Sequence, residues 1–129
     1  MSASQSASRF GKNKRLLNAG DYSRVFDQPG ARASHRSLLL LARYNERDRH
    51  RLGLVIAKKN VKLAAQRNRI KRVTREFFRQ LPDSEPHMDV ILLARRGLDD
   101  LDNASLTSTL EQQWHKLVRK AGDNSEAKS

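Results

Sequence analysis

The chain has 129 residues, a formal net charge of +12 and no cysteine, so we expect one domain with a modest core and exclude disulfide bonds and thiolate metal sites. No apolar run is as long as a membrane span, and the N-terminus has no hydrophobic signal segment, so a cytoplasmic protein is the simplest expectation. The excess of cations lies between Met1 and Arg79, and this concentration of charge predicts nucleic acid as the polyanionic partner.

The N-terminal segment 1–8 is rich in Ser and Ala and is expected to be a disordered tail. A single RNA-binding domain is expected over residues 9–120, followed by a second disordered tail over residues 121–129. Inside the domain, Asp21 resembles an N-cap and predicts a short helix over residues 21–28, which a Pro-Gly pair ends.

Three apolar runs have the length of β-strands and cover residues 37–44, 51–59 and 89–96. The first two are joined by a short charged loop, so we expect them to form an antiparallel hairpin. A helix over residues 61–80 follows the second run, and two prolines shortly after it prevent its continuation.

A last helix is expected from Asp102 or Asn103 to about Lys120. One of its faces is apolar and consists of Leu106, Leu110, Trp114 and Leu117. The predicted order α-β-β-α-β-α indicates an α+β fold, a compact α/β sandwich in which helices pack on a small mixed sheet.

The helix predicted over residues 61–80 is the most informative segment. Residues 58–79 contain nine Lys or Arg and one acidic residue, Glu76. An apolar stripe at helical spacing runs along it and consists of Leu63, Ile70, Val73, Phe77 and Leu81. The polar side chains outside this stripe are Arg67, Asn68, Lys71, Arg72, Arg75 and Arg79.

This pattern predicts a helix that docks on the core by one face and presents cations on the other. Guanidinium groups bind phosphates in a bidentate manner, and an Asn side chain both donates and accepts at a base edge or a 2′-hydroxyl. The alternative is a solvated helix face without a ligand. An ordinary exposed face mixes charges of both signs, whereas this one is almost entirely positive.

Two further groups are candidates for contacts with RNA. Tyr22 and Phe26 lie four residues apart on the first helix, where they form either a stacking platform for single-stranded bases or an ordinary part of the core. Lys58 and Lys59 precede the basic helix and extend its positive surface. Catalytic groups are not assembled in the sequence, since the four histidines lack metal-ligand spacing and no Gly-rich phosphate loop is present.

The run RNRIKR, residues 67–72, resembles the RNR signature of the bacterial ribonuclease P protein subunit. The resemblance extends over residues 9–119. It includes FGKNKRLLNAGDYSRVF at the start, RLGLVIAKKN before the basic helix and DVILLARRGL after it. Three letters alone would carry little weight, but their combination with the preceding strand, the Lys pair and this order of elements is specific.

The resemblance implies a function. Proteins of this family join a large catalytic RNA, and the complex is an endoribonuclease that hydrolyses the 5′ leader from precursor tRNA. The RNA holds most of the Mg²⁺ and performs the catalysis, so the isolated chain is expected to be inactive. We also expect one protein copy per RNA and no organic cofactor, and we assign no metal-binding residue to the protein.

The resemblance also assigns roles to individual residues. It implies a cleft in which Tyr22, Phe26, Lys58 and Lys59 face the leader, and Leu41 stands where some members carry another aromatic of this cleft. It further implies a left-handed βαβ crossover, which the usual right-handed preference would not predict. Contacts with the catalytic RNA are implied for Arg67, Asn68, Arg69, Lys71, Arg72 and Arg75.

Two other functions remain open at this point. A ribosomal or other structural RNA-binding protein would also need a basic face on a small α/β domain. A self-sufficient nuclease would need clustered carboxylates or histidines. The acidic residues Asp99, Asp100 and Asp102 are more typical of a loop that caps a helix than of a metal site.

Overall fold

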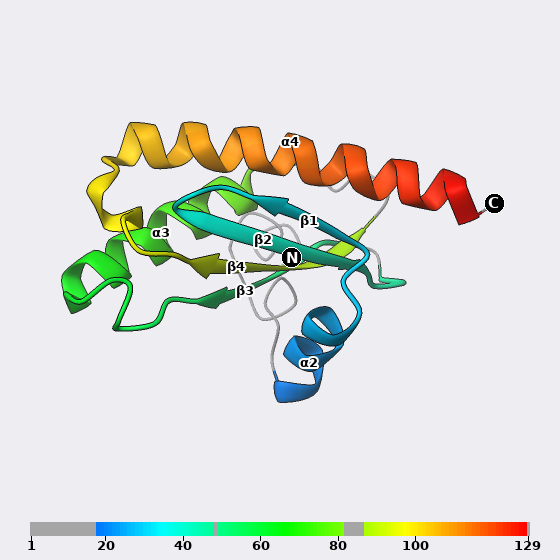
Figure 1. Ribbon diagram of the computed structural model, residues 1–129, viewed down its shortest axis with the longest axis horizontal. Helices are drawn as coiled ribbons and strands as arrows, with labels where there is room; N and C mark the ends of the chain where they lie inside the picture. Colours follow the sequence, from blue (N-terminus) through cyan, green and yellow to red (C-terminus); the bar gives the residue numbers. More distant parts are fainter. Residues whose placement is uncertain (1–17, 48, 82–86, 129) are drawn as a thin grey trace, which may run out of the picture.

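The computed structural model describes residues 18–47, 49–81 and 87–128, with the backbone alone for residues 122–128. The expected tail over residues 1–8 therefore lies outside the described residues. Figure 1 shows one four-stranded sheet with helices on both sides. In chain order the elements are α2 (Ala19–Asp27), β1 (Ala31–Ser34), β2 (Leu38–Tyr44), β3 (Arg51–Val55), α3 (Ala64–Arg79), β4 (Met88–Ala94), the 3-10 turn η2 (Leu98–Asp100) and α4 (Asn103–Lys128).

The strands follow the order β1-β2-β4-β3, and only the β3–β4 pair is parallel. The predicted mixed sheet is confirmed, but the predicted hairpin between residues 37–44 and 51–59 is wrong, because β4 lies between these two strands. Strand β4 is apolar on both faces, and a central position buries both. The true hairpin joins β2 to β1, which was not predicted because ARAS is short and poor in strand-forming residues.

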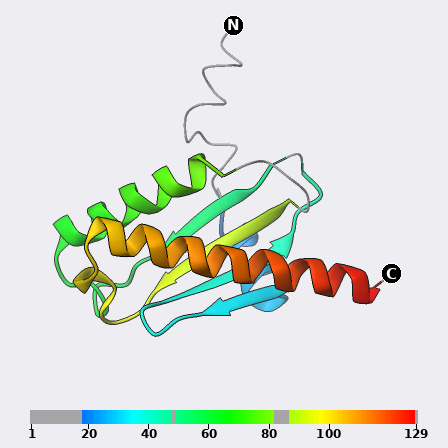
Figure 2. The same ribbon diagram turned by 90° about the horizontal axis from the view of Figure 1, so that it is seen from above.

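Helices α3 and α4 cover the same face of the sheet, as the view from above shows (Figure 2). Side chains of alternate strand residues, such as Leu40 and Leu92, form the main core with α4. The predicted apolar face of α4 is confirmed, since Leu106, Leu110, Trp114 and Leu117 are all buried.

The start of α4 was predicted correctly, and its end was not. The backbone N–H of Ser105 donates to Asp102 Oδ1 at 2.8 Å, and this bond lowers the pKa of Asp102. The predicted cap is therefore confirmed. The predicted end near Lys120 is wrong, because the helix continues to Lys128 and buries Ala121 against the core.

Of the described helices, only α2 lies on the opposite face of the sheet (Figure 1). Val25 of α2 packs with Leu41 and Ile91 in a second, smaller apolar cluster. The predicted cap of this helix is wrong: Asn18 is the N-cap, and its Oδ1 accepts from the backbone N–H of Asp21 at 2.9 Å. Asp21 lies one turn further along and points into the protein.

Arg51 explains why Asp21 is buried. Its guanidinium forms two hydrogen bonds with Asp89 of β4, at 2.8 and 2.7 Å, and reaches Asp21 Oδ1 at 3.4 Å. All three residues are no more than 6% exposed. The hydrogen bonds to Asp89 raise the pKa of Arg51, so the guanidinium is charged at every working pH. This buried cluster ties α2 to β3 and β4.

We predict that Arg51→Ala destabilises the fold by about 3–5 kcal/mol, because it removes the counter-charge of the buried Asp89 and the closer of the two cations paired with the buried Asp21. Urea denaturation measures the change in the free energy of unfolding. The control is Arg47→Ala, which removes an exposed cation from the β2–β3 loop and is expected to change stability by less than about 0.5 kcal/mol. Equal effects of the two changes would contradict a structural role for the buried cluster.

Candidate nucleic-acid interface

Helix α3 docks by an apolar face that differs in part from the predicted stripe. Ile70, Thr74 and Phe78 are its buried residues, while Val73 and Phe77 pack against the core from its margin. Leu63 is 64% exposed and is not on this face. It is the N-cap residue and has an extended backbone (φ −86°, ψ 130°), so helical periodicity does not apply to it.

The opposite side of α3 presents the predicted cations. Asn68 and Arg72 are exposed, and the other four candidates, Arg67, Arg69, Lys71 and Arg75, are half-buried. No described carboxylate forms an ion pair with Arg67, Lys71 or Arg72. The charges of these three residues therefore remain available to a polyanion. At the C-terminal end, Arg79 pairs with Glu76 of the same helix.

Arg67 is partly engaged in the fold. Its Nη1 donates to the carbonyl oxygens of Val61 and Lys62, at 2.9 and 2.8 Å. These carbonyls belong to the turn that leads into α3. Arg67 thus stabilises the start of the helix while it adds positive charge to the surface.

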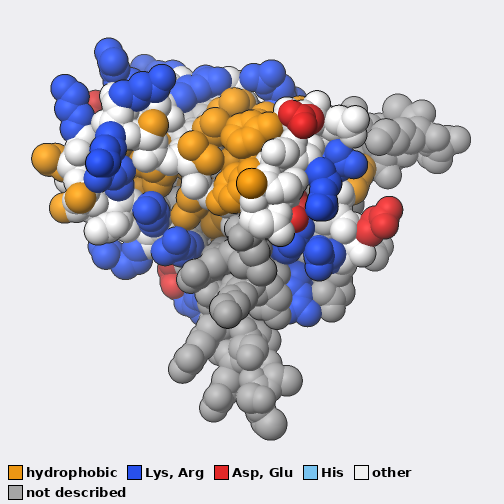
Figure 3. Space-filling model, turned by 90° about the horizontal axis from the view of Figure 1, so that it is seen from below, with side chains coloured by type: hydrophobic (Ala, Val, Ile, Leu, Met, Phe, Trp, Pro, Cys, Tyr) orange, Lys and Arg blue, Asp and Glu red, His pale blue; other side chains and the backbone are white. Residues whose placement is uncertain are grey.

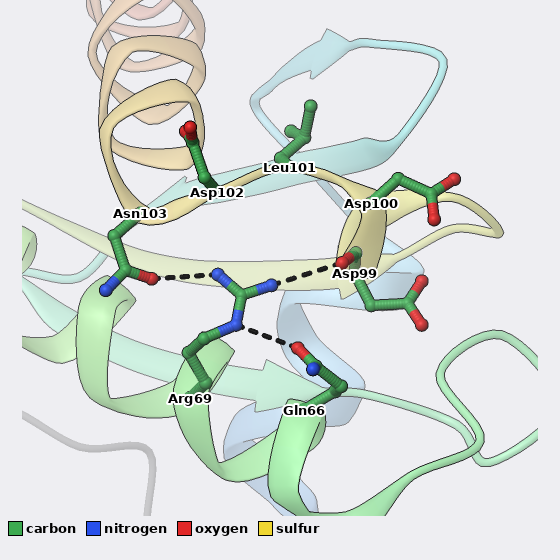
Figure 4. A pocket seen from close by; sticks show the side chains of 7 residues that line it. All are labelled: Gln66, Arg69, Asp99, Asp100, Leu101, Asp102 and Asn103. Carbon is green, nitrogen blue, oxygen red and sulfur yellow. Dashed lines mark hydrogen bonds between the residues drawn. The ribbon is translucent and has the colours of Figure 1, made fainter.

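Arg69 joins three elements (Figure 4). Its guanidinium donates to Gln66 Oε1 at 2.8 Å, to Asn103 Oδ1 of α4 at 2.8 Å and to the Asp99 carbonyl of η2 at 3.2 Å. A shallow pocket of about 390 Å³ surrounds it. These bonds fix α3 against α4. Because they use a large share of the N–H groups of Arg69, only part of its guanidinium is left for an external ligand.

Lys58 and Lys59 are exposed on the turn between β3 and α3. The predicted strand over residues 51–59 is shorter than expected, since β3 ends at Val55. The side chain of Asn60 donates to the carbonyl of Ala94 at 2.9 Å, which holds the turn at the end of β4. The lysine pair thus lies beside the last residues of the two parallel strands.

The face of the sheet that carries α2 forms a second candidate surface, which we call the open face. Space-filling Figure 3 shows hydrophobic side chains gathered in its middle with Lys and Arg around them. Tyr22 packs half-buried on the small apolar cluster of this face, and Phe26 is 42% exposed beside it. Leu39, Val55 and Leu93 are also partly buried there.

Leu41 lies on the same face but is only 7% exposed. It packs under α2 against Val25 and Ile91. At this position the chain therefore has a buried aliphatic side chain and no exposed aromatic ring.

Sequence reasoning missed three cations that border this face. Arg51 was not predicted, although an isolated Arg at the start of an apolar strand is a signal for a buried ion pair. Arg43 lies on β2 and donates to Gln28 Oε1 at 2.9 Å, which supports the end of α2. Arg95 follows β4 directly, and its guanidinium donates to Ser34 Oγ at 3.1 Å. Strand alternation places Arg43 on the same face as Leu39.

The histidines are placed in the fold as parts of its packing and hydrogen bonding. His50 is buried in an aromatic cluster with Phe78, His87 and Trp114, and its Nδ1 accepts from the N–H of Met88 at 3.1 Å. Within the described part of the chain, no group of three His, Asp or Glu is placed to hold a metal ion. Nor do the helices there include one that is long and apolar enough to cross a membrane.

Comparison with known proteins identifies the family. The model of the family described as ribonuclease P matches residues 10–118. The chain belongs to the ribonuclease P protein family. It is 49% identical over 111 residues to the ribonuclease P protein component of Marinobacter nauticus, which covers 86% of this chain and 83% of that protein. The corresponding component of Ectopseudomonas mendocina is 49% identical over 110 residues, with coverages of 85% and 82%.

Solved structures of the family have the same fold. The ribonuclease P protein of Staphylococcus aureus superposes with a TM-score of 0.72 at 27% identity, over 79% of this chain and 93% of that one. The Thermotoga maritima protein gives 0.66 at 26% identity, over 81% and 96%. Membership of the family supports a subunit of ribonuclease P that works with the RNA of that enzyme.

We predict that two cations of the α3 surface differ in their importance for stability. Arg69→Ala removes two hydrogen bonds that join α3 to η2 and α4, and a third within α3, and is expected to cost about 1–3 kcal/mol. Arg72→Ala removes an exposed side chain and is expected to cost less than about 0.5 kcal/mol. Urea denaturation of both variants measures the difference. Equal losses would mean that the Arg69 bonds contribute nothing to the fold.

Proposed function

We propose that this chain is the ribonuclease P subunit that binds the catalytic RNA through the α3 cations and the 5′ leader of precursor tRNA through the open face. The observation that carries the proposal is the α3 surface itself. Arg67, Lys71 and Arg72 form no ion pair with a described carboxylate, and the reverse side of the helix is fixed to the core. A phosphate backbone supplies the counter-charges that the fold does not.

The open face supports the second part of the proposal. It offers an aromatic ring that is exposed at Phe26, a second ring at Tyr22 and partly exposed aliphatic side chains nearby. Unpaired bases of a single-stranded leader stack on aromatic side chains, and their phosphates are attracted to surrounding cations such as Lys58 and Lys59. A double-stranded RNA would not present its bases to such a surface.

Hydrolysis is assigned to the RNA in this proposal. Mg²⁺ held mainly by the RNA would activate the attacking water and stabilise the leaving oxygen. The residues of this chain bind the two RNAs, orient the leader and neutralise phosphate charge between them. Neutralisation by protein cations would also lower the Mg²⁺ concentration at which the complex works.

Cleavage of precursor tRNA tests the proposal. The purified chain alone is expected to be inactive, and its addition to the cognate catalytic RNA at low Mg²⁺ is expected to restore removal of the 5′ leader. Cleavage by the chain alone would indicate a self-sufficient nuclease. If the chain had no effect on that RNA, a structural role in another ribonucleoprotein would be favoured.

We predict that Arg72→Ala weakens binding to the catalytic RNA and reduces the slope of log K against log[salt] by about 0.7–0.9, the value for one lost phosphate contact. Filter binding at several KCl concentrations measures both effects. Arg47→Ala removes the same charge from the β2–β3 loop, outside the α3 surface, so its slope is expected to match that of the unchanged chain. The same reduction in both variants would show that net charge, and not the α3 surface, governs binding.

We predict that Phe26→Ala weakens binding of leader-bearing precursor by about 5- to 150-fold, because stacking contributes about 1–3 kcal/mol per base. Mature tRNA without a leader is the control substrate, and its binding is expected to remain unchanged. The affinity of the assembled complex for each substrate is the measurement. Equal losses for the two substrates would place Phe26 outside the leader site.

A further inference from the structure

The β1–β2 turn, residues 35–37, lies at one end of the open face. Helix α2 is attached near the other end of the sheet, where β2 ends and β3 begins, through Arg43 and Arg51. The turn lies where β1 and β4 end and β2 begins. It therefore borders the part of the open face that α2 leaves uncovered.

Arg95 is held in a defined position at this turn. Its backbone N–H donates to the carbonyl of Ser37 at 2.9 Å. Its Nη1 donates to Ser34 Oγ at 3.1 Å and to the carbonyl of His35 at 2.8 Å. The other guanidinium N–H groups of Arg95 have no acceptor among the described residues, so they are available to a bound anion.

Other positive groups converge on the same place. The ring of His35 is oriented by the N–H of Ser37, which donates to its Nδ1 at 3.0 Å. Burial lowers the pKa of His35, and the nearby charges of Arg36, Lys116 and Arg95 lower it further. Lys116 comes from α4. One turn later, Lys120 binds the carbonyl of Arg32 at 3.0 Å.

Asp100 is the carboxylate that faces this turn from η2. Gly97 lies between the two: a Cβ at that position would lie 4.0 Å from Ser37 Oγ and 3.8 Å from Asp100 Oδ2. Within the described residues, no carboxylate forms an ion pair with Arg36, Arg95 or Lys116. The turn therefore keeps an excess of positive charge.

The turn is continuous with the apolar part of the open face. Ser34 pairs with Leu39, Leu39 pairs with Leu93, and Leu93 pairs with Val55 across the sheet. The three apolar members of this row are partly exposed. Arg95 binds Ser34 at the end of this row of residues. A single-stranded RNA whose bases cover the row therefore has its phosphate backbone within reach of Arg95.

We propose that Ser34, His35, Arg36, Arg95 and Lys116 form a binding site for a phosphodiester group of the single-stranded RNA on the open face. We call these five residues the turn site. This inference rests on the proposed function, because it extends the path of the leader beyond the aromatic residues of α2. A phosphate at the turn site accepts hydrogen bonds from Arg95 and offsets the charges of Arg36 and Lys116.

The site has a consequence for pH dependence. A bound phosphate offsets the cations that lower the pKa of His35, so RNA binding raises this pKa towards or above its ordinary value of about 6.5. By linkage, the affinity for RNA increases as the pH falls through the pKa that His35 has in the complex, and it levels off below the lower pKa of the free chain.

The first experiment measures the affinity of the full chain for a short single-stranded oligoribonucleotide. Lys116→Gln and Arg36→Gln are each expected to reduce it about five- to tenfold. Both residues are exposed, so the fold is expected to be kept. Arg47→Gln is the matched control, with the same loss of charge on the β2–β3 loop and an expected change of less than about twofold. Equal effects of all three would overturn the turn site.

The second experiment follows the ring protons of His35 by NMR during a pH titration. Lys116→Gln is expected to raise the pKa of His35 in the free chain, and the oligoribonucleotide is expected to raise it in the unchanged chain. An unchanged pKa with RNA bound would overturn the proposal. An equal rise with inorganic phosphate at the same concentration would assign the site to free phosphate and would also overturn it.

These results are separable from a failure of the proposed function. If the chain restores leader removal by the catalytic RNA but the turn variants bind leader-bearing precursor normally, only the turn site is wrong. If the chain does not affect the catalytic RNA, the proposed function itself is wrong, whatever the oligoribonucleotide shows.

Discussion

Strand β4 is apolar on both faces, and the positions of the other elements depend on the need to cover it. Its pairing with β2 on one side and β3 on the other places it inside the sheet. The two long helices cover only one face, which leaves Ile91 and Leu93 of β4 to the other. Helix α2 covers Ile91, while Leu93 remains partly exposed. The same constraint thus produces both a packed core and an apolar open face.

The buried cluster around Arg51 determines which part of the open face α2 covers and which part stays uncovered. An ion pair with so little exposure contributes little net stability compared with apolar residues, but its loss leaves uncompensated charges inside the protein. It fixes α2 at one end of the sheet, so Tyr22 and Phe26 always border the uncovered region. The cations of α3 lie around the edge of the sheet, on a helix held by Arg69 and by its own apolar face. One small domain therefore presents two surfaces of different chemistry.

Much of this arrangement could be predicted from the sequence. The periodicity of α3 and α4 indicated their buried faces, and the apolar runs identified β2, β3 and β4. The order of the strands could not be predicted. Strands β2 and β3 are consecutive in the chain, which favours a hairpin between them, whereas the apolar residues on both faces of β4 place it between the two. Leu63 was placed wrongly because it precedes the first helical turn. Asp21 was taken for a cap because its partner Arg51 is distant in sequence, and local patterns do not reveal such pairs.

The candidate site was predictable in composition but not in detail. The cations of residues 67–72 were evident, yet their division between external charge and internal bonds depends on tertiary contacts. Arg67 and Arg69 bind carbonyl and amide oxygens of neighbouring segments, whereas Arg72 is exposed. The turn site was not predicted, because its members come from β1, the following turn, the end of β4 and α4. Only the folded chain brings them together.

The most direct test of the two-surface account is side-chain footprinting with hydroxyl radicals on the complex of this chain with the catalytic RNA. We expect that the catalytic RNA alone protects Lys71 and Arg72, and that Tyr22 and Phe26 become protected only when leader-bearing precursor tRNA is added. Protection of all four residues by the catalytic RNA alone, or of none of them in the full complex, would show that the two surfaces do not bind different RNAs.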